Sequence, residues 1–377
     1  MKEASRVVSV LGGYGIFGGR IAEALSRDDS CRVRVVGRNV KVGGNFAYRI
    51  GADFRPCTLD DRDSLRRALD GSFAVIHAAG PFQGGDYRVA EVCLELGAHY
   101  LDLSDARIFV AGIGRLDADA RRRGLLVVSG VSSTPAITSA LINELTSEFS
   151  RIDEIHTALS PGNRNPRGVS TVAAVLSYVG REIRVWRDGR WVSRPGWGDA
   201  RRLDFPSPVG RRRVYNCDVP DLELFPSVFN AQTVRFSAGL ELNVLNHLLS
   251  VCSLPCRWLG LNLMRRAKLF LDVSLMLFPF GTTNGALAVW LRGRNHPGDF
   301  IERRIALVTD YDGPATPSSA AVVLTRKILA SGPLRAGAFP CVGLLTLDEL
   351  LVHLRPLGIW CVRGDESGWQ ETLQNNG

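Results

Sequence analysis

The feature that most constrains this chain is a strand-like segment that runs directly into closely spaced glycines. Residues 7–19 read VVSVLGGYGIFGG, and apolar residues with helical spacing follow. The pattern Gly13-x-Gly15-x-x-Gly18 between a strand and a helix is typical of a dinucleotide-binding turn. Its glycines permit a tight turn, approach of the backbone to a pyrophosphate, and close packing of the helix. A strand–turn–helix without ligand is the structural alternative.

The end of the second predicted strand indicates which dinucleotide is preferred. This strand covers residues 32–36 and ends in Gly37-Arg38-Asn39. Sites that prefer NAD usually place an acid here, which accepts hydrogen bonds from the ribose 2′-hydroxyl. The acid is missing, and the Arg38 cation can pair with a 2′-phosphate instead. We therefore expect NADP as cofactor, with NAD less favoured; the alternative is a solvated loop arginine.

The charge balance is basic but does not indicate a nucleic-acid partner. The 377 residues, enough for two domains, carry a net charge of +8. Only four of the 46 basic residues are lysines, and the arginines are spread along the whole chain. No nucleic-acid-binding module is recognisable among them. We expect no nucleic-acid partner and a mild attraction for anionic ligands.

The cysteines and the N-terminus indicate a cytoplasmic protein without a metal centre. The eight cysteines show no paired C-x-x-C spacing, which favours reduced thiols over a disulfide framework or a zinc site. The first predicted strand begins at residue 7, which leaves no room for a signal peptide. We therefore predict no bound metal and a cytoplasmic location.

Strands and helices alternate through the first third of the chain. We predict six strands, the first beginning at residue 7 and the others near residues 32–36, 52–57, 73–79, 100–103 and 125–129. Helices are expected between them, among others at residues 41–50, 86–96 and 109–123. This alternation predicts an α/β fold with a Rossmann doubly wound parallel sheet over residues 1–145. Ligands of such sheets bind at the carboxyl ends of the strands.

Four segments of this region resemble the N-terminal domain of saccharopine-dehydrogenase-like NADP-binding proteins. They read GGYGIFG (12–18), VGRN (36–39), VIHAAGPF (75–82) and GAHYLD (97–102). The resemblance implies a nucleotide-binding domain with an inserted antiparallel or mixed-sheet domain, nicotinamide-dependent redox chemistry and a homodimer. It also implies a small-molecule or lipid-like substrate. The predicted cofactor-binding residues are Gly13, Tyr14, Gly15, Ile16, Phe17, Gly18, Arg38, Ala79 and Gly80.

The remainder is less periodic, and we predict a second, α+β domain over residues 146–315. A hairpin is expected over residues 183–191, with Asp188-Gly189 in its turn. Residues 194–213 are rich in Pro and Arg and should be dominated by loops. Strands are expected near residues 232–236 and 304–310. The segment 316–377 contains two predicted helices, 318–329 and 347–354, from which the chain can return to the first domain.

Residues 257–291 form a long apolar region whose role is open. Residues 273–291 carry no charge and approach the length of a membrane span. Pro279-Phe280-Gly281 interrupts them, so we predict a helix, a turn and a buried strand rather than a span. The apolar and basic residues before them fit a helix in peripheral contact with a membrane, the wall of a greasy cavity, or ordinary domain or dimer packing. The last of these is favoured.

The catalytic residue cannot be chosen from the sequence. The nicotinamide performs hydride transfer, so the protein has to orient the substrate and supply at most one proton donor. Candidates near predicted strand ends are His77, Asp102 and Ser132. Each also has a structural explanation, as a buried hydrogen-bonded histidine or as a helix cap.

The absence of four motifs argues against short-chain dehydrogenases, hydrolases with a nucleophilic serine, P-loop nucleotidases and His-Glu-x-x-His metalloenzymes. No Tyr-x-x-x-Lys, Gly-x-Ser-x-Gly, phosphate-binding Gly-x-x-x-x-Gly-Lys or His-Glu-x-x-His pattern occurs in the chain. We therefore predict an NADP(H)-dependent oxidoreductase that transfers hydride to or from a C=N, C=O or activated C=C bond. The alternative is a non-catalytic NADP-binding protein that senses redox state or serves a partner.

Overall fold

The computed structural model describes residues 6–332 and 335–370, which fold into two units. The first unit contains residues 1–136 and 314–345, and the second contains residues 137–313 and 346–377. The chain therefore leaves each unit and later returns to it.

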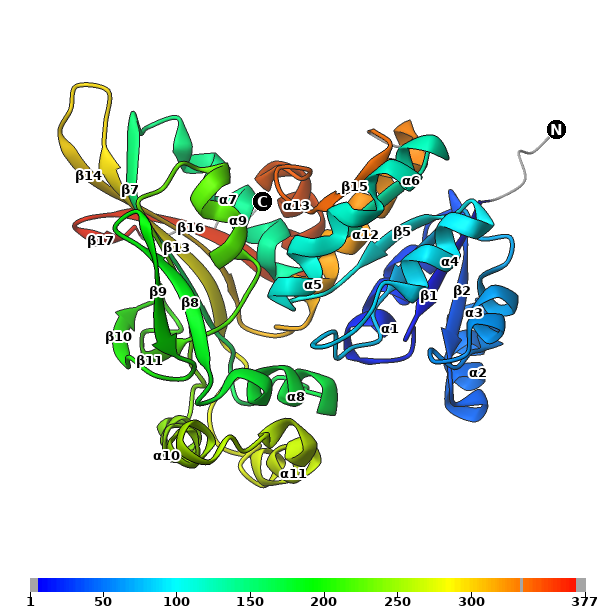
Figure 1. The fold of residues 1–377 in the computed structure, drawn as a ribbon, viewed down its shortest axis with the longest axis horizontal. Coiled ribbons are helices and arrows are strands. Elements are labelled where there is room, and N and C mark those ends of the chain that lie inside the picture. The colour runs from blue at the N-terminus through cyan, green and yellow to red at the C-terminus, as the bar shows by residue number, and fades with distance from the viewer. Residues whose placement is uncertain (1–5, 333–334, 371–377) are drawn as a thin grey trace. The chain divides into compact units, whose positions relative to one another are not determined.

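The first unit is built on a parallel sheet of seven strands (Figure 1). The strand order is β15-β6-β5-β4-β1-β2-β3, which confirms the predicted doubly wound α/β fold. Six strands were predicted; the seventh, β15, comes from the C-terminal part of the chain. The strands are β1 (Arg6–Leu11), β2 (Cys31–Gly37), β3 (Asp53–Pro56), β4 (Ala74–His77), β5 (His99–Asp102), β6 (Leu126–Ser129) and β15 (Gly337–Pro340).

The central strands of this sheet are short and buried. All residues of β4, β5 and β6 are buried, as is most of β1 and β2. Runs of Val, Ile and Leu without polar alternation are expected where helices cover both faces of a parallel sheet. The sheet thereby becomes a rigid base whose strand ends can position a ligand.

Helices connect these strands, and one predicted helix is broken. The expected helix over residues 109–123 is replaced by α5, a 3₁₀ turn over Gly112–Leu116, and α6. Gly112 and Gly114 lie in this stretch, and glycine weakens a helix interior. The α-helices of this unit are α1 (Ile16–Ser26), α2 (Val40–Arg49), α3 (Arg62–Leu69), α4 (Arg88–Leu96), α5 (Arg107–Ala111), α6 (Asp117–Arg122) and α12 (Ala315–Ser331).

The second unit contains a mixed sheet of ten strands, as expected for an α+β domain. The main order is β10-β11-β12-β7-β13-β14-β16-β17, and the β8–β9 hairpin branches from β12. Only β12 and β7 pair in parallel; the other pairs are antiparallel. The strands are β7 (Arg151–Ser160), β8 (Glu182–Arg187), β9 (Arg190–Pro195), β10 (Arg201–Asp204), β11 (Arg211–Asn216), β12 (Thr233–Ala238), β13 (Gly285–Arg294), β14 (Phe300–Thr309), β16 (Ile359–Asp365) and β17 (Gly368–Trp369).

The β8–β9 hairpin confirms the turn predicted from Asp188-Gly189. Both residues have positive φ, 51° and 74°. Two-residue hairpin turns require this conformation, which Asp tolerates and Gly adopts freely. By contrast, the prediction that loops dominate residues 194–213 holds only in part, because β10 and the ends of β9 and β11 lie within this region. The arginine-rich sequences of β10 and β11 hide the apolar alternation by which strands are recognised.

The apolar region of the second unit is not a membrane span. It forms α11, a turn and the buried strand β13, which is the predicted arrangement. None of the helices within residues 6–332 and 335–370 is long and apolar enough to cross a bilayer. The helices of this unit are α7 (Thr138–Thr146), α8 (Val169–Tyr178), α9 (Asp221–Val228), α10 (Asn243–Leu259), α11 (Ala267–Met276) and α13 (Leu347–Leu354).

Candidate functional site

The glycine-rich turn between β1 and α1 is closely packed. Gly12 has φ +80° and donates its N–H to Val36 O at 2.8 Å. A Cβ atom on Gly18 would lie 2.3 Å from Gly12 O, so the helix approaches the turn at a distance that only glycine permits. The left-handed residue is therefore Gly12, which the sequence pattern did not single out, while Gly18 has the packing role predicted for it.

The N-terminus of α1 offers backbone donors to an anion. Gly15 is the exposed N-cap residue, and no side chain caps the helix. The first turn, which includes Ile16 and Phe17, contains no acidic residue. Unsatisfied N–H groups and the positive end of the helix dipole favour a phosphate at such a position. This uncapped glycine cradle fits the pyrophosphate of a dinucleotide.

Residues from neighbouring strands surround the turn. The Tyr14 hydroxyl accepts a hydrogen bond from Asn39 N at 2.9 Å, which ties the turn to the end of β2. Ala79 lies beyond β4 against Gly12, where an added Cβ would be 3.0 Å from Ala79 Cβ. Gly80 follows Ala79 directly. Asn39 and Ala79 are thus brought to the glycine turn from the ends of β2 and β4, the two strands that flank β1.

Arg38 lies immediately after β2, at the carboxyl end of the strand beside β1. It is exposed, and its side chain has no hydrogen-bond or ion-pair partner among the described residues. The neighbouring Asn39 instead caps α2 through a bond from Val42 N to its Oδ1, 3.0 Å. Arg38 is therefore a cation available to a ligand.

Two of the three catalytic candidates belong to one buried network. His77 ends β4 and is paired in register with Asp102, which ends β5. His77 Nδ1 lies 3.1 Å from the Tyr100 hydroxyl, and Tyr100 stands two residues before Asp102 on β5. Phe82 packs edge-on against the imidazole, with ring centroids 4.8 Å apart. The network joins the carboxyl ends of β4 and β5.

Asp102 connects this network to the loops after β5 and β6. Its Oδ1 accepts hydrogen bonds from Ser104 N, Ser129 Oγ and Gly130 N, each 2.9 Å long. Burial raises the Asp102 pKa to about 6, although these hydrogen bonds oppose the shift. Burial also lowers the His77 pKa to about 4. Near pH 7 the imidazole is neutral and the carboxylate mostly ionised.

Ser132 is not joined to the network through its side chain. It is buried just after β6, and its backbone N–H donates to Gly130 O at 2.9 Å. Sequence reasoning also missed Tyr100 and Ser129, because strand residues with apolar neighbours give no signal of a polar role. The one sequence signal is that side chains alternate between the two faces of a strand, which places Tyr100 and Asp102 on the same face of β5.

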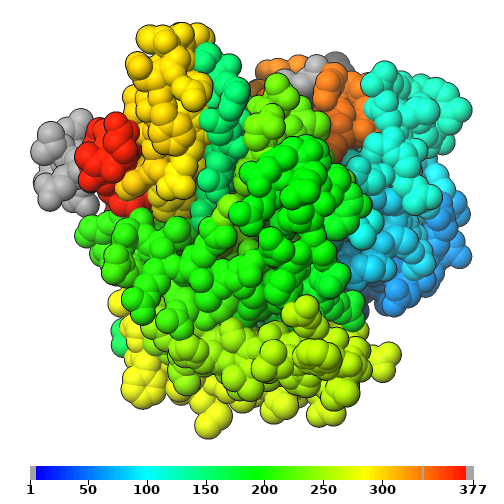
Figure 2. All heavy atoms as spheres, turned by 60° about the vertical axis from the view of Figure 1, so that its left-hand side comes forward, coloured from blue at the N-terminus to red at the C-terminus, as the bar shows by residue number. Residues whose placement is uncertain are grey.

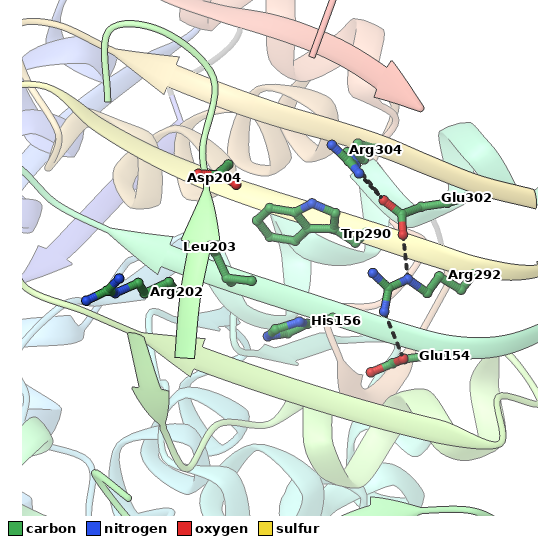
Figure 3. Close-up of a pocket in the computed structure, with 9 residues that line it drawn as sticks. All are labelled: Glu154, His156, Arg202, Leu203, Asp204, Trp290, Arg292, Glu302 and Arg304. Carbon is green, nitrogen blue, oxygen red and sulfur yellow. Dashed lines mark hydrogen bonds and ion pairs between the residues drawn. The ribbon is translucent and has the colours of Figure 1, made fainter. Parts of the chain in front are cut away.

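The second unit has a polar pocket of about 170 Å³ over β7, β13 and β14 (Figure 3). Arg292 pairs with both Glu154 and Glu302, and Arg304 also pairs with Glu302. Each of these carboxylates already has a guanidinium partner. We therefore interpret these ion pairs as stabilising the sheet and not as an acid–base site. The lining residues are Glu154, His156, Arg202, Leu203, Asp204, Trp290, Arg292, Glu302 and Arg304.

An acidic side chain is buried at the start of α9 in the same unit. Asp221 is 1% exposed, and burial raises its pKa to about 8. Neither carboxyl oxygen of Asp221 has a hydrogen-bond partner among the described residues. The carboxyl is therefore largely protonated near pH 7. Its position in the sequence gave no sign of this, because an acid at a helix start usually caps the helix from solvent.

The fold and the glycine cradle define a dinucleotide-binding α/β domain followed by a mixed-sheet unit. Residues 8–128 match the family described as saccharopine dehydrogenase NADP-binding domain. This domain of the chain belongs to that family, and the membership indicates an NAD(P) cofactor.

Comparison with solved structures gives one match that supports the same fold. Apo saccharopine dehydrogenase (L-Glu forming) from Saccharomyces cerevisiae is 14% identical, with a TM-score of 0.71 over 96% of this chain and 99% of its own. GenD2 from gentamicin A biosynthesis, in complex with NAD, is 16% identical, with a TM-score of 0.43 over 95% of this chain and 93% of its own. A search of curated protein sequences finds no match. At these identities the first comparison establishes a shared fold.

Proposed function

We propose that this protein is an NADP(H)-dependent oxidoreductase that transfers hydride to or from a C=N, C=O or activated C=C bond. Its substrate is a small or lipid-like molecule. The observation that carries the proposal is the uncapped glycine turn at Gly15, which offers backbone N–H groups where a pyrophosphate would bind. Membership of the first domain in an NADP-binding family supports the same cofactor.

Arg38 supports NADP(H) over NAD(H). Its exposed guanidinium has no partner in the described chain and follows the strand adjacent to β1. A guanidinium forms paired, charge-assisted hydrogen bonds with a phosphate. An acid at this position would repel the 2′-phosphate, so replacing it with arginine changes the preference through both attraction and relief of repulsion.

The remaining residues of the site divide into binding and positioning groups. When bound, the nicotinamide supplies or accepts the hydride. In the proposal, the N–H groups after Gly15 hold the pyrophosphate and Arg38 binds the 2′-phosphate. Asp102 is a positioning residue because it is fully buried and holds the loops after β5 and β6. His77 Nε2 is buried and has no hydrogen-bond partner among the described residues, and we propose this imidazole as the group that relays a proton.

The proposal is tested by following NADPH absorbance with panels of imine, ketone and enoyl acceptors. We expect oxidation with at least one acceptor class. We also expect His77→Gln to lower kcat more than it raises KM, because a proton relay acts in the chemical step. Tight NADPH binding without oxidation by any acceptor would contradict the proposal. It would favour the non-catalytic, redox-sensing alternative.

A further inference from the structure

The exposed apolar side chains of this protein are concentrated in one segment of the second unit. Eleven of the twenty large apolar side chains exposed in the described residues lie between residues 244 and 280. This segment comprises α10, α11 and the turns beside them, and its yellow-green atoms line the lower edge of Figure 2. The eleven are Val244, Leu248, Val251, Leu254, Trp258, Leu259, Leu261, Leu269, Leu275, Met276 and Phe280.

Helix α10 is apolar on two opposite sides. One side is buried and packs through Leu245, Leu249 and Cys256. The other side carries Val244, Leu248, Val251 and Trp258, at spacings of four, three and seven residues that keep them on one exposed stripe. Helices at a protein surface normally present polar residues to water. The outer stripe of α10 is therefore an apolar surface without a partner in the described chain.

Exposed cations belong to the same segment as this stripe. Residues 243–280 contain four exposed basic residues and a single acid, Asp272. None of the four basic side chains has a hydrogen-bond or ion-pair partner among residues 6–332 and 335–370. They are Arg257, Arg265, Arg266 and Lys268.

We propose that α10 and α11 dock this protein on an anionic lipid bilayer. The eleven apolar side chains and four cations named above, here called the α10–α11 surface, combine the two attractions that interfacial helices use. Trp258, 80% exposed, and Phe280, 60% exposed, are amphipathic or aromatic groups suited to the headgroup level. Since none of the helices in the described residues can span a bilayer, the surface lies on the membrane rather than crossing it.

Charge complementarity favours lipid over a second copy of the chain. A two-fold dimer through this surface would place the same patch on both sides of the interface. Four unpaired cations would then face four more, with Asp272 as the nearby acid of each copy. Anionic headgroups instead neutralise these cations, and each basic residue near such a membrane strengthens binding by about fivefold.

The test is co-flotation of the full chain with vesicles of phosphatidylglycerol and phosphatidylcholine, compared with phosphatidylcholine vesicles alone. We expect flotation with the anionic vesicles at low salt, and loss of most of it at high salt. Trp258→Asp should abolish flotation, and Arg265→Glu with Arg266→Glu should remove the preference for anionic vesicles. Trp258 is exposed, so its replacement leaves the core intact.

Val352→Asp is the matched control, because Val352 on α13 is 78% exposed but lies outside the α10–α11 surface. It should float like the unmodified protein. Equal flotation on neutral vesicles, no flotation at all, or flotation unaffected by Trp258→Asp would overturn the proposal. A dimer in sedimentation that Trp258→Asp dissociates, without vesicle binding, would assign the surface to a second copy instead. None of these readouts depends on NADPH.

Discussion

Among single residues, Arg38 and Asp102 show how exposure or burial of a charged side chain determines its role in the site. Arg38 is exposed and has no partner in the described chain, whereas Asp102 is fully buried and accepts three hydrogen bonds. The first arrangement leaves a charge available to a ligand, and the second uses a charge to organise loops. Arg38 follows the end of β2 and Asp102 is the last residue of β5, so sequence position alone did not distinguish their roles.

Arg38→Asp should reverse the preference between the two dinucleotides. Loss of charge-assisted hydrogen bonds to the 2′-phosphate, with added repulsion, predicts NADPH binding about tenfold to a hundredfold weaker. NADH binding should be unchanged or stronger, because the new acid can accept from the ribose hydroxyl. Titration of both dinucleotides by fluorescence gives the ratio. Arg190→Asp, on the exposed strand β9, is the control, and an unchanged ratio in Arg38→Asp would remove this residue from the site.

Asp221 should make stability depend on pH. Its pKa is about 8 in the folded state, against about 4 when unfolded, so the folded state binds the proton more tightly. The stabilisation is complete below about pH 4 and is lost as pH rises towards 8, by about 1.4 kcal/mol per pH unit. Asp221→Asn should therefore gain stability relative to the unmodified protein between pH 5 and about 8. Urea unfolding at several pH values measures this.

The exposed Asp272→Asn on α11 is the control for that experiment and should leave the pH dependence as it is. Parallel curves for Asp221→Asn and the unmodified protein would mean that the Asp221 carboxyl is charged in the folded state.

At the scale of elements, the glycine turn is the part that the function most depends on. Gly12 and Gly18 are required by the fold itself, through a positive φ and a backbone approach of 2.3 Å. Gly15 differs, because its φ of −78° and ψ of −179° suit any residue. A Cβ there would lie 3.2 Å from Gly12 O, a tight but tolerable contact. Gly15 is therefore the position where binding can be separated from folding.

Gly15→Ala should weaken NADPH binding by about tenfold or more while the protein stays folded. The added methyl group occupies space that the pyrophosphate needs in order to approach the backbone. Gly44→Ala on α2 is the matched control, since an added Cβ meets no atom within 4 Å. It should leave affinity unchanged and stabilise the helix by about 0.5–1 kcal/mol. Equal affinities for both variants would contradict the proposed phosphate position.

Elements of the first domain could be predicted because their signals are local. Buried strands such as β1 and β4 are apolar runs bounded by glycine, and α2 was expected within one residue of its observed ends. Strand β15 was missed because four residues give too short a pattern, and its pairing partner β6 is distant in sequence. The edge strand β10 and its neighbour β11 were missed because their arginine-rich sequences resemble a loop.

The candidate site was predictable only in part, for a related reason. The glycine turn and Arg38 follow from a spacing that a ligand imposes on the chain. His77 contacts Tyr100 and lies in register with Asp102, because parallel pairing of β4 and β5 aligns the ends of these strands. Such alignment depends on strand register, which single-strand patterns do not contain. The protonated state of the Asp221 carboxyl could not be predicted either, because it results from burial, which the sequence does not show.

At the scale of the whole molecule, the chain crosses between its two units more than once. Residues 314–345 add α12 and β15 to the first unit, and residues 346–377 belong to the second. Within the first unit, the Ser318 hydroxyl on α12 lies 3.4 Å from Phe17 O at the start of α1. The helix that would receive the pyrophosphate is thus supported by a segment about 300 residues away in sequence.

The proposed chemistry requires a dinucleotide bound over the turn at Gly15, with its 2′-phosphate at Arg38. Calorimetric titration of the intact protein with NADPH tests this most directly. We predict a single site with affinity in the range of roughly 1 μM to 1 mM and weaker binding of NADH. Absence of heat for either dinucleotide at roughly millimolar concentration would contradict the account.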